Sequence, residues 1–278
     1  EHAAEQFMDT YAPGVGWCLL ARDGRLRLKA PDLGLDLREQ TNRPPTPPRA
    51  TTTRLFTDLN RWLLKVMLMR AQPPTTWGGP RAGLPYRNPT ELHRVAGVSL
   101  ETAHRFVRTF EAADFIRRAP EGLRIVRADA LFEQWLHDER SRAPMRMPAR
   151  GLYGSVERNE LLVMLEASAT RHAIGGYAAC AELGLLHATR QQLDIHVDTD
   201  AAQALLIMEL EACEPRDAMV WIVRSRYRES VFRGVTQTDQ GPVVDELQAA
   251  LDVIHDPGRG NEQATFIVGR LLASLEQQ

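Results

Sequence analysis

The chain has 278 residues, of which 44% are hydrophobic and 25% charged, a composition typical of a soluble globular protein with two domains. No apolar run approaches the roughly 18 residues of a membrane span, and the first residues lack the features of a signal peptide, so we expect no membrane contact. Three scattered cysteines, Cys18, Cys180 and Cys213, argue against a disulfide framework or zinc ribbon and favour a cytoplasmic location.

Charge divides the chain into two parts. Residues 1–150 contain 24 Lys and Arg against 17 Asp and Glu, whereas residues 151–278 contain 10 against 19. The resulting balances of +7 and −9 add up to the net charge of −2. A basic first part and an acidic second part indicate that contact with a polyanion belongs to the first part.

The first fifty residues predict a hairpin and a linker. Residues 15–30 read as two strands around Asp23-Gly24, a pair that favours a type I′ turn. Residues 41–50 contain four prolines and predict an extended linker. We therefore expect residues 1–50 to form an N-terminal hairpin with a Pro-rich linker.

A helix is predicted from about Thr53 to Arg70, with Thr57 or Asp58 as its cap. Its core residues recur at helical spacing: Leu59, Trp62, Leu63, Val66 and Met67. Residues 72–88 are rich in Gly and Pro and predict a long loop.

Residues 88–127 carry the strongest signal. Asn88 and Pro89 begin a short helix with Leu92, Val95 and Ala96 on its buried face, and Gly97 supplies the turn after it. Ser99 caps a second helix, from Leu100 to Ala113, whose apolar stripe is predicted to be Ala103, Phe106, Val107 and Phe110.

A hairpin follows the second helix, from Phe115–Arg118 to Leu123–Arg127. Helix, glycine turn, longer helix and basic hairpin, in this order, indicate a winged helix-turn-helix. We assign it to a DNA-binding domain of residues 51–145, which ends in a helix capped by Asp129.

The second of the two helices would read double-stranded DNA. Arg105 and Arg108 share its outward face with His104, and Arg pairs bidentately with guanine, so we predict these three as base readers. Ser99 and Thr102, at the helix start, could add contacts to bases or phosphates. We predict contacts to the DNA backbone from further arginines: Arg87, Arg94, Arg117, Arg118 and Arg124. The hairpin arginines, together with Arg127, would place the wing on the flanking backbone or in the minor groove. The alternative is a winged helix used for protein contact, or a solvated arginine face.

Residues 151–278 predict an α/β domain, so the expected fold class is α+β. Residues 141–150, basic and containing prolines, are predicted to be the interdomain linker. The domain's helices are predicted near 157–167, 177–183, 201–212, 243–254 and 261–276. Strands are predicted at 191–199 and 219–225, with an edge strand and turn in 226–241.

Patterns that could carry catalysis are weak. Gly154-Ser155 precedes Glu157 and Glu160, but this acidic spacing does not fit a nucleotidyltransferase. Arg27-Leu28-Lys29 places Arg where a nuclease core of the PD-(D/E)xK type needs an acid. We therefore predict no enzymatic activity, no metal and no cofactor.

Two segments leave alternatives open. Asp194, His196 and Asp198 alternate along one strand and could hold a metal, or could be the solvent-facing side of an edge strand. Residues 255–260, HDPGRG, could cradle an anion at a helix start, or form a structural turn between two helices.

Small residues at set spacings in the second part resemble the AbiEi-type antitoxins of type IV toxin–antitoxin systems. The resemblance spans roughly residues 55–278. Gly175, Gly176, Ala178 and Ala179 resemble the family's Gly-rich entry to an Ala-rich helix, followed by Leu183-Gly184 and the strand Ile195-His196-Val197. The family's last signature is similar to Leu251-Asp252, Arg259-Gly260 and Glu262-Gln263.

The resemblance implies a repressor that binds inverted repeats in the promoter of its own operon, possible homodimer formation on DNA, and a nucleotidyltransferase-type toxin as partner. The acidic second part departs from the basic C-terminal domain of well-known members. Two alternatives stay open: an adaptor for protein–protein interaction whose winged helix is structural, and a metal-dependent nucleotidyltransferase-like enzyme.

Overall fold

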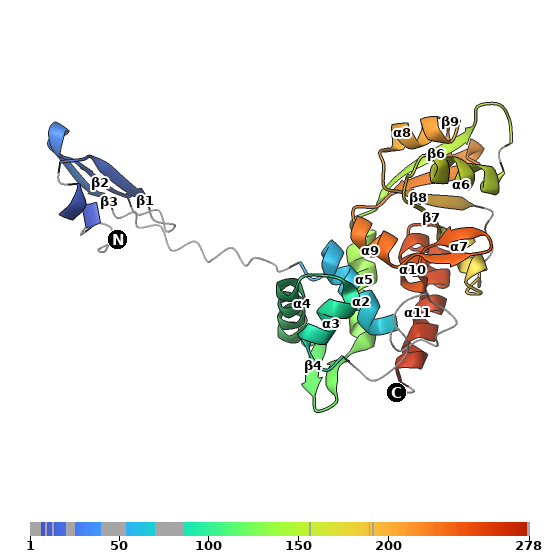
Figure 1. Ribbon diagram of the computed structural model, residues 1–278, viewed down its shortest axis with the longest axis horizontal. Helices are drawn as coiled ribbons and strands as arrows, with labels where there is room; N and C mark the ends of the chain where they lie inside the picture. Colours follow the sequence, from blue (N-terminus) through green and yellow to red (C-terminus); the bar gives the residue numbers. More distant parts are fainter. Residues whose placement is uncertain are drawn as a thin grey trace. The chain divides into compact units, whose positions relative to one another are not determined.

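The computed structural model describes residues 7–8, 10–12, 14–20, 26–39, 54–69, 86–155, 157–188, 190 and 192–276. It divides into two compact units, Glu1–Thr53 and Arg54–Gln278. The Asp23-Gly24 turn, the Pro-rich segment 41–50 and most of the predicted loop 72–88 lie outside the described residues. The fold is mixed α+β, the class that the sequence predicts (Figure 1).

The first unit contains a three-stranded antiparallel sheet. The strands are β1 (Trp17–Leu20), β2 (Leu26–Ala30) and β3 (Leu35–Glu39), in the order β1-β2-β3. The predicted hairpin of β1 and β2 is confirmed, with Cys18 opposite Leu28. The third strand was not predicted; the short helix η1 (Pro31–Leu33) connects it to β2, and Gly34 ends that helix.

The second unit begins with a helical part. Its elements are α2 (Asp58–Met69), α3 (Pro89–Ala96), α4 (Leu100–Ala112), β4 (Ile116–Ala119), β5 (Gly122–Ile125) and α5 (Ala128–Arg140). The predicted helices and hairpin are confirmed to within a few residues. Strands β4 and β5 pair in antiparallel register, with Arg117 opposite Arg124.

Local sequence signals explain how α3 and α4 are separated. The Asn88 side chain accepts a hydrogen bond from the Glu91 amide and caps α3, whereas Ser99 caps α4 through the Thr102 amide. Gly97 ends α3 with φ of 62°, a left-handed conformation that glycine adopts without strain. These caps fix where one helix ends and the next begins.

The helices of this part bury their predicted stripes except at Leu59, which is half-buried, and at Val95. All four predicted core residues of α4 are fully buried. Val95, predicted to be buried, is 38% exposed, because α3 is short and packs through Leu92 and Ala96. Asp129 does not cap α5. The residue at the N-cap position of this helix is Arg127, whose backbone is in a left-handed conformation.

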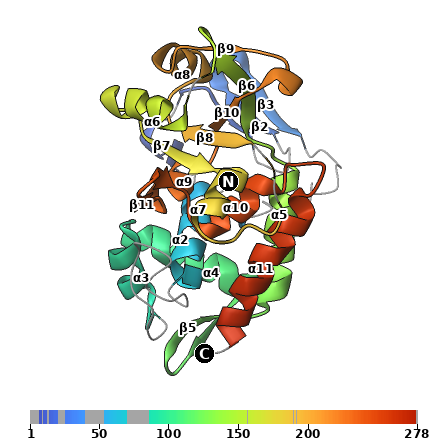
Figure 2. The same ribbon diagram turned by 90° about the vertical axis from the view of Figure 1, so that its right-hand side faces the viewer.

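A seven-stranded mixed sheet forms the rest of the unit, in the order β11-β12-β7-β8-β10-β6-β9 (Figures 1 and 2). Strands β12 and β7 are parallel, as are β8 and β10, and the other neighbours are antiparallel. The strands are β6 (Met145–Gly151), β7 (His172–Gly175), β8 (Leu193–Val197), β9 (Leu210–Ala212), β10 (Val220–Arg224), β11 (Thr236–Thr238) and β12 (Gly241–Val243).

Helices cover both faces of this sheet. Helices α6 (Arg158–Ala167) and α8 (Ala201–Ile207) contact one another over one face, and α7 (Gly176–Glu182) and α10 (Glu246–Val253) pack on the opposite face (Figure 2). Helix α11 (Gly260–Glu276) packs along α10. Strand β8 is therefore buried on both sides, which its alternating polar residues did not predict.

Two expectations for the second part are wrong, and a third is incomplete because it lacks a helix. The predicted linker 141–150 contains β6, because Met147 and Ala149 turn toward the sheet's core and pair with β10. The predicted helix 201–212 ends at Ile207, and its last residues form β9. The region 226–241 contains the short helix α9 (Arg228–Arg233) before the edge strand β11.

Candidate nucleic-acid interface

The outward face of α4 carries three exposed basic residues. His104, Arg105 and Arg108 all point away from the buried stripe of Phe106 and Phe110. None of the three side chains makes a hydrogen bond or ion pair within the part of the chain that the structure describes. An arginine without an internal partner keeps all five of its donors for a ligand.

The start of α4 is less open than the sequence predicts. Ser99 is exposed, but its Oγ lies 2.8 Å from Thr102 Oγ1 and 3.1 Å from the Thr102 amide that it caps. Thr102 is only 8% exposed. The Thr102 side chain therefore supports the helix start from inside, and only Ser99 of this pair lies at the surface.

Helix α3 presents Arg94 to solvent, and Arg87 is exposed just before it. The Arg87 backbone amide donates to a Glu91 carboxylate oxygen at 2.8 Å, which fixes the entry to the helix. The structure thus places both residues on the surface of the same helical part as α4.

The hairpin arginines are exposed but paired with carboxylates. Arg117 and Arg127 contact Asp114, Arg118 contacts Glu111, and Arg124 contacts Glu121. Each of the four arginine side chains is more than half exposed. Arg117 and Arg127 hold the pKa of Asp114 below its usual range.

The turn between α3 and α4 is held from two sides. The Ala96 carbonyl accepts hydrogen bonds from Trp62 Nε1 at 2.7 Å and from Arg233 Nη1 at 3.1 Å. Arg233 Nη1 also donates to the Gly97 carbonyl at 3.0 Å. Trp62 belongs to α2 and Arg233 to α9, so the turn is tied both to the helical part and to the sheet part.

Helix α2 makes further polar contacts with the sheet part. The Lys65 ammonium is fully buried and donates to Asp245, to Gln248 and to the Ser230 carbonyl at 2.8–3.0 Å, which uses all three of its protons. The Asp58 carboxylate accepts from the Glu229 and Ser230 amides. Asp58 therefore caps α9 rather than its own helix.

Arg61, one turn along α2, is also buried. Its guanidinium contacts Asp138 and Glu139 of α5 and lies 3.5 Å from the ring centre of Tyr227. A buried arginine needs such partners because its charge cannot be left unpaired away from water. The amphipathic pattern of α2 did not predict that Arg61 and Lys65 would be buried.

The residues considered for a metal site lie in the interior instead. The Asp194 carboxylate accepts from Arg146 Nη2 at 2.8 Å and from Gln192 Nε2 at 2.7 Å. Burial raises the pKa of Asp194, and Arg146 opposes this shift. Asp198, in contrast, pairs with Arg171 and Arg228 near the surface.

His196 belongs to a buried network with α10. Its Nε2 lies 2.8 Å from Asp252, whose carboxylate also accepts from Gln248 Nε2 and from the Gly176 amide. Burial raises the pKa of Asp252, but His196 and these donors outweigh it and hold the pKa below its usual range. Within the described ranges, no cluster of three His, Cys, Asp or Glu residues could hold a metal ion.

This network explains the Gly175-Gly176 pair. A Cβ atom at Gly175 would lie 2.6 Å from an Asp252 oxygen and 2.7 Å from His196, and one at Gly176 would lie 2.3 Å from an Asp194 oxygen. Side chains at these positions cannot fit beside the carboxylates. The two glycines therefore give the buried acids room, which is a structural role.

Residues 255–260 form the junction between α10 and α11. Asp256 is buried and accepts from Tyr177, Arg190 and the Gly258 amide. Its contacts tie the junction to α7, as expected for the structural alternative of this segment. The Cys180 thiol nearby is fully buried, and burial raises its pKa to about 12, so it is not a reactive thiol.

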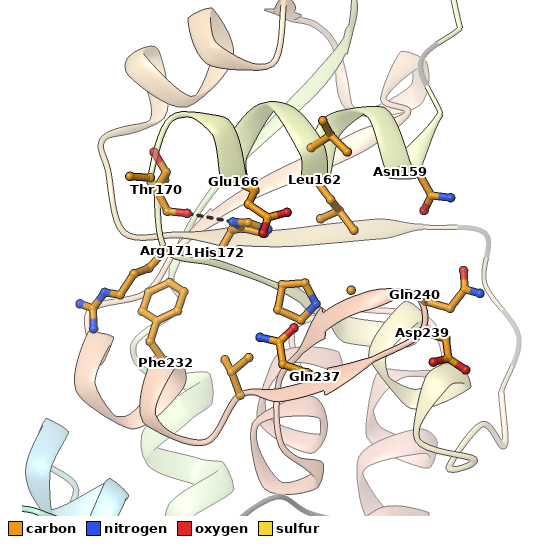
Figure 3. A pocket seen from close by; sticks show the side chains of 15 residues that line it. Asn159, Leu162, Glu166, Thr170, Arg171, His172, Phe232, Gln237, Asp239 and Gln240 are labelled. Atoms are coloured by element: carbon orange, nitrogen blue, oxygen red, sulfur yellow. Dashed lines mark hydrogen bonds between the residues drawn. The ribbon is translucent and has the colours of Figure 1, made fainter.

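A groove of about 640 Å³ opens beside the β11 edge of the seven-stranded sheet (Figure 3). Helix α6 forms one wall with Asn159, Leu162 and Glu166, and the β11–β12 hairpin and Phe232 lie opposite (Figure 3). None of the predicted DNA-contacting residues lines it.

None of the helices in the described ranges combines the length and the apolar character of a membrane span. No protein-family model matches the chain, and neither a curated protein nor a solved structure is significantly similar to it.

Proposed function

We propose that residues 86–127 form a winged helix-turn-helix that binds double-stranded DNA by sequence, with α4 in the major groove. The observation that carries this proposal is the unpaired basic face of His104, Arg105 and Arg108 on a helix whose opposite stripe is fully buried. Arg in this position can donate two hydrogen bonds to guanine O6 and N7. The two arginines are three residues apart and so share one face of the helix.

The β4–β5 hairpin supports the proposal as the wing. Its arginines pair with exposed carboxylates, and such surface pairs contribute at most about 1 kcal/mol each, so exchanging a carboxylate for a DNA phosphate costs little. Residues 86–127 contain eight arginines and five acidic residues, a balance of +3. Arg87 and Arg94 would contact the backbone from the α3 side.

The biological role that fits this activity is a transcriptional regulator, a repressor of its own operon acting as a homodimer on inverted repeats. This assignment, like the nucleotidyltransferase-type toxin as partner, rests on the resemblance to AbiEi-type antitoxins. Protein contact through the same arginine face is the second candidate. One observation favours it: every hairpin arginine pairs with a carboxylate that also lies within residues 86–127.

Selection of randomised DNA duplexes on the full-length protein tests the proposal and identifies the recognised sequence in the same experiment. We expect a recurring motif, and affinity for it that falls steeply as salt rises. By fluorescence anisotropy, Arg105→Ala and Arg108→Ala should each weaken binding to the selected duplex by roughly 5- to 150-fold. They should leave binding to unrelated DNA much less affected, because base contacts specify and phosphate contacts do not.

Arg216→Ala is the matched control. Arg216 lies in the acidic second part, its side chain is 85% exposed, and the substitution removes the same charge as Arg105→Ala. It should leave affinity for the selected duplex unchanged. If no motif emerges, or if Arg105→Ala binds the duplex as Arg216→Ala does, the proposal of sequence-specific DNA binding is wrong. Protein contact then becomes the better explanation of the exposed arginine face.

A further inference from the structure

The groove of Figure 3 lies beside a sheet edge that no strand covers in the described residues. Strand β11 is the last strand of the seven and pairs only with β12. Its central residue, Gln237, lies opposite Pro242. Proline has no amide hydrogen, so this cannot be an antiparallel pair that exchanges two hydrogen bonds.

The backbone groups of Gln237 therefore face away from β12. In an antiparallel ladder, residues of a pair without mutual hydrogen bonds turn their N–H and C=O groups toward the outer neighbours. On the outer side of β11, no described residue bonds the Gln237 amide or carbonyl. The edge thus offers one donor and one acceptor at the spacing that an extended chain requires.

The groove also has a charge preference. Glu166 and Asp239 line it, and neither carboxylate has a hydrogen-bond or ion-pair partner among the residues that the structure describes. Arg171 in the same lining is already bound to Asp198 at 2.8 Å and lies over the Phe232 ring. A basic ligand would complement the two free carboxylates, whereas an acidic one would meet like charge.

Apolar side chains complete the lining. Leu162 and Val163 come from α6, and Phe232, Val235 and Pro242 come from the opposite side. The Gln237 side chain points into the groove in Figure 3, so the face of the hairpin that carries it faces α6. A strand added at the β11 edge would turn every second side chain toward this lining.

We propose that this site binds an extended segment of a partner protein in which every second residue faces the groove, and these groove-facing side chains are basic and apolar in turn. The segment pairs with the backbone of Gln237, its basic side chains reach Glu166 and Asp239, and its apolar groups cover Val163 and Phe232. Main-chain pairing supplies affinity and the groove supplies selectivity, as in other cases where a peptide extends a sheet. The site is separate from α4, so it would serve a partner other than DNA.

Fluorescence anisotropy with short labelled peptides tests this proposal on the full-length protein. The probe is a peptide that repeats Lys-Ser-Val-Ser, and the matched probe repeats Glu-Ser-Val-Ser, so that the charged and the Val side chains share one face of the strand. We expect saturable binding of the basic probe, and binding of the acidic probe weaker by about tenfold or more. Glu166→Gln with Asp239→Asn should weaken the basic probe about threefold or more, whereas the exposed and distant Glu214→Gln should have no effect.

Gln237→Pro tests the strand pairing. It removes the outward N–H without removing a bond of the β11–β12 ladder, so it should weaken the basic probe about tenfold, whereas Gln237→Ala should not. Should Gln237→Pro fail to fold, the strand pairing can be tested with the unaltered protein. Basic peptides that are N-methylated on alternate residues lack the N–H groups for this pairing and should bind more weakly. Equal binding of both probes, no binding at about 1 mM, or indifference to both Gln237→Pro and N-methylation would overturn the proposal.

Discussion

At the scale of single residues, buried ionisable groups distinguish this protein from what its composition predicts. Lys65, Asp194, Asp245 and His196 are all at most 3% exposed, although charged residues are rarely buried without partners. Each has a hydrogen-bond partner: Lys65 and Asp245 bind one another, Asp194 binds Arg146, and His196 binds Asp252. Their burial makes them sensitive to substitution and rules out a direct role in contacting a large ligand.

Glu246 provides a test through pH. It is 4% exposed at the start of α10, and burial, helped by Asp245 and opposed by Arg270, raises its pKa to about 7 from an ordinary 4.5. The folded state therefore binds the proton more tightly than the unfolded state. The free energy of unfolding should fall as pH rises from about 4.5 to 7, and the full loss should be present at pH 8.

Glu246→Gln removes this penalty. We expect it to stabilise the protein at pH 8 by an amount on the order of 2 kcal/mol, and to change stability little at pH 4, where the glutamate is protonated in both states. Urea unfolding at the two pH values measures the difference, with Glu214→Gln as an exposed control. A substitution that destabilises equally at both pH values would show that the Glu246 charge is compensated in the fold.

At the scale of elements, α2 decides how the two parts of the second unit meet. It packs against α3 and α4 on one side and against α9 on the other. Lys65 and Asp58 bind the sheet part, Arg61 contacts Tyr227 beside α9, and Trp62 binds the turn before α4. Helix α2, which packs against the proposed DNA-reading helix α4, is therefore also anchored in the sheet part.

Lys65→Met should be strongly destabilising, by about 3–5 kcal/mol, because it leaves Asp245 buried without its cationic partner. Adding Asp245→Asn should recover a large share of that loss, since Asn removes the charge and can still cap α10. Chemical denaturation of the two single variants and the double variant gives the coupling between the residues. Additive losses would mean that the Lys65–Asp245 pair contributes nothing specific to this contact.

At the scale of the whole molecule, residues 54–278 form one compact unit by their contacts. The sequence predicts separate domains at 51–145 and 151–278, whereas contacts group residues 54–278 into one compact unit. Residues 145–150 of the predicted linker belong to β6, which lies between β10 and the edge strand β9 of the large sheet. Buried polar contacts from α2 cross the predicted boundary.

A fragment of residues 54–144 should therefore fail to fold on its own. It would expose the Lys65 environment and the α2 face that contacts α9, while keeping all the elements of the proposed winged helix. We expect no cooperative thermal transition by circular dichroism, in contrast to residues 54–278. A fragment that unfolds cooperatively would show that the helical part is an independent domain and that its contacts with the sheet are secondary.

The sequence by itself determined the local elements of this protein. Asn88, Gly97 and Ser99 act on their nearest backbone neighbours, and the stripe of Phe106 and Phe110 follows from helical periodicity, so α3, α4 and the exposed face of Arg105 could be predicted. The hairpin of β4 and β5 follows from an equally local turn.

Only the tertiary structure decided what is buried between elements distant in sequence. Asp194 and His196 alternate on β8 like the outer face of an edge strand, yet Arg146 and Asp252, 48 and 56 residues away, satisfy them inside a central one. Lys65 and Asp245 are 180 residues apart. Periodicity reports which residues share a face, but whether that face meets water or a partner depends on elements that the chain brings together only on folding.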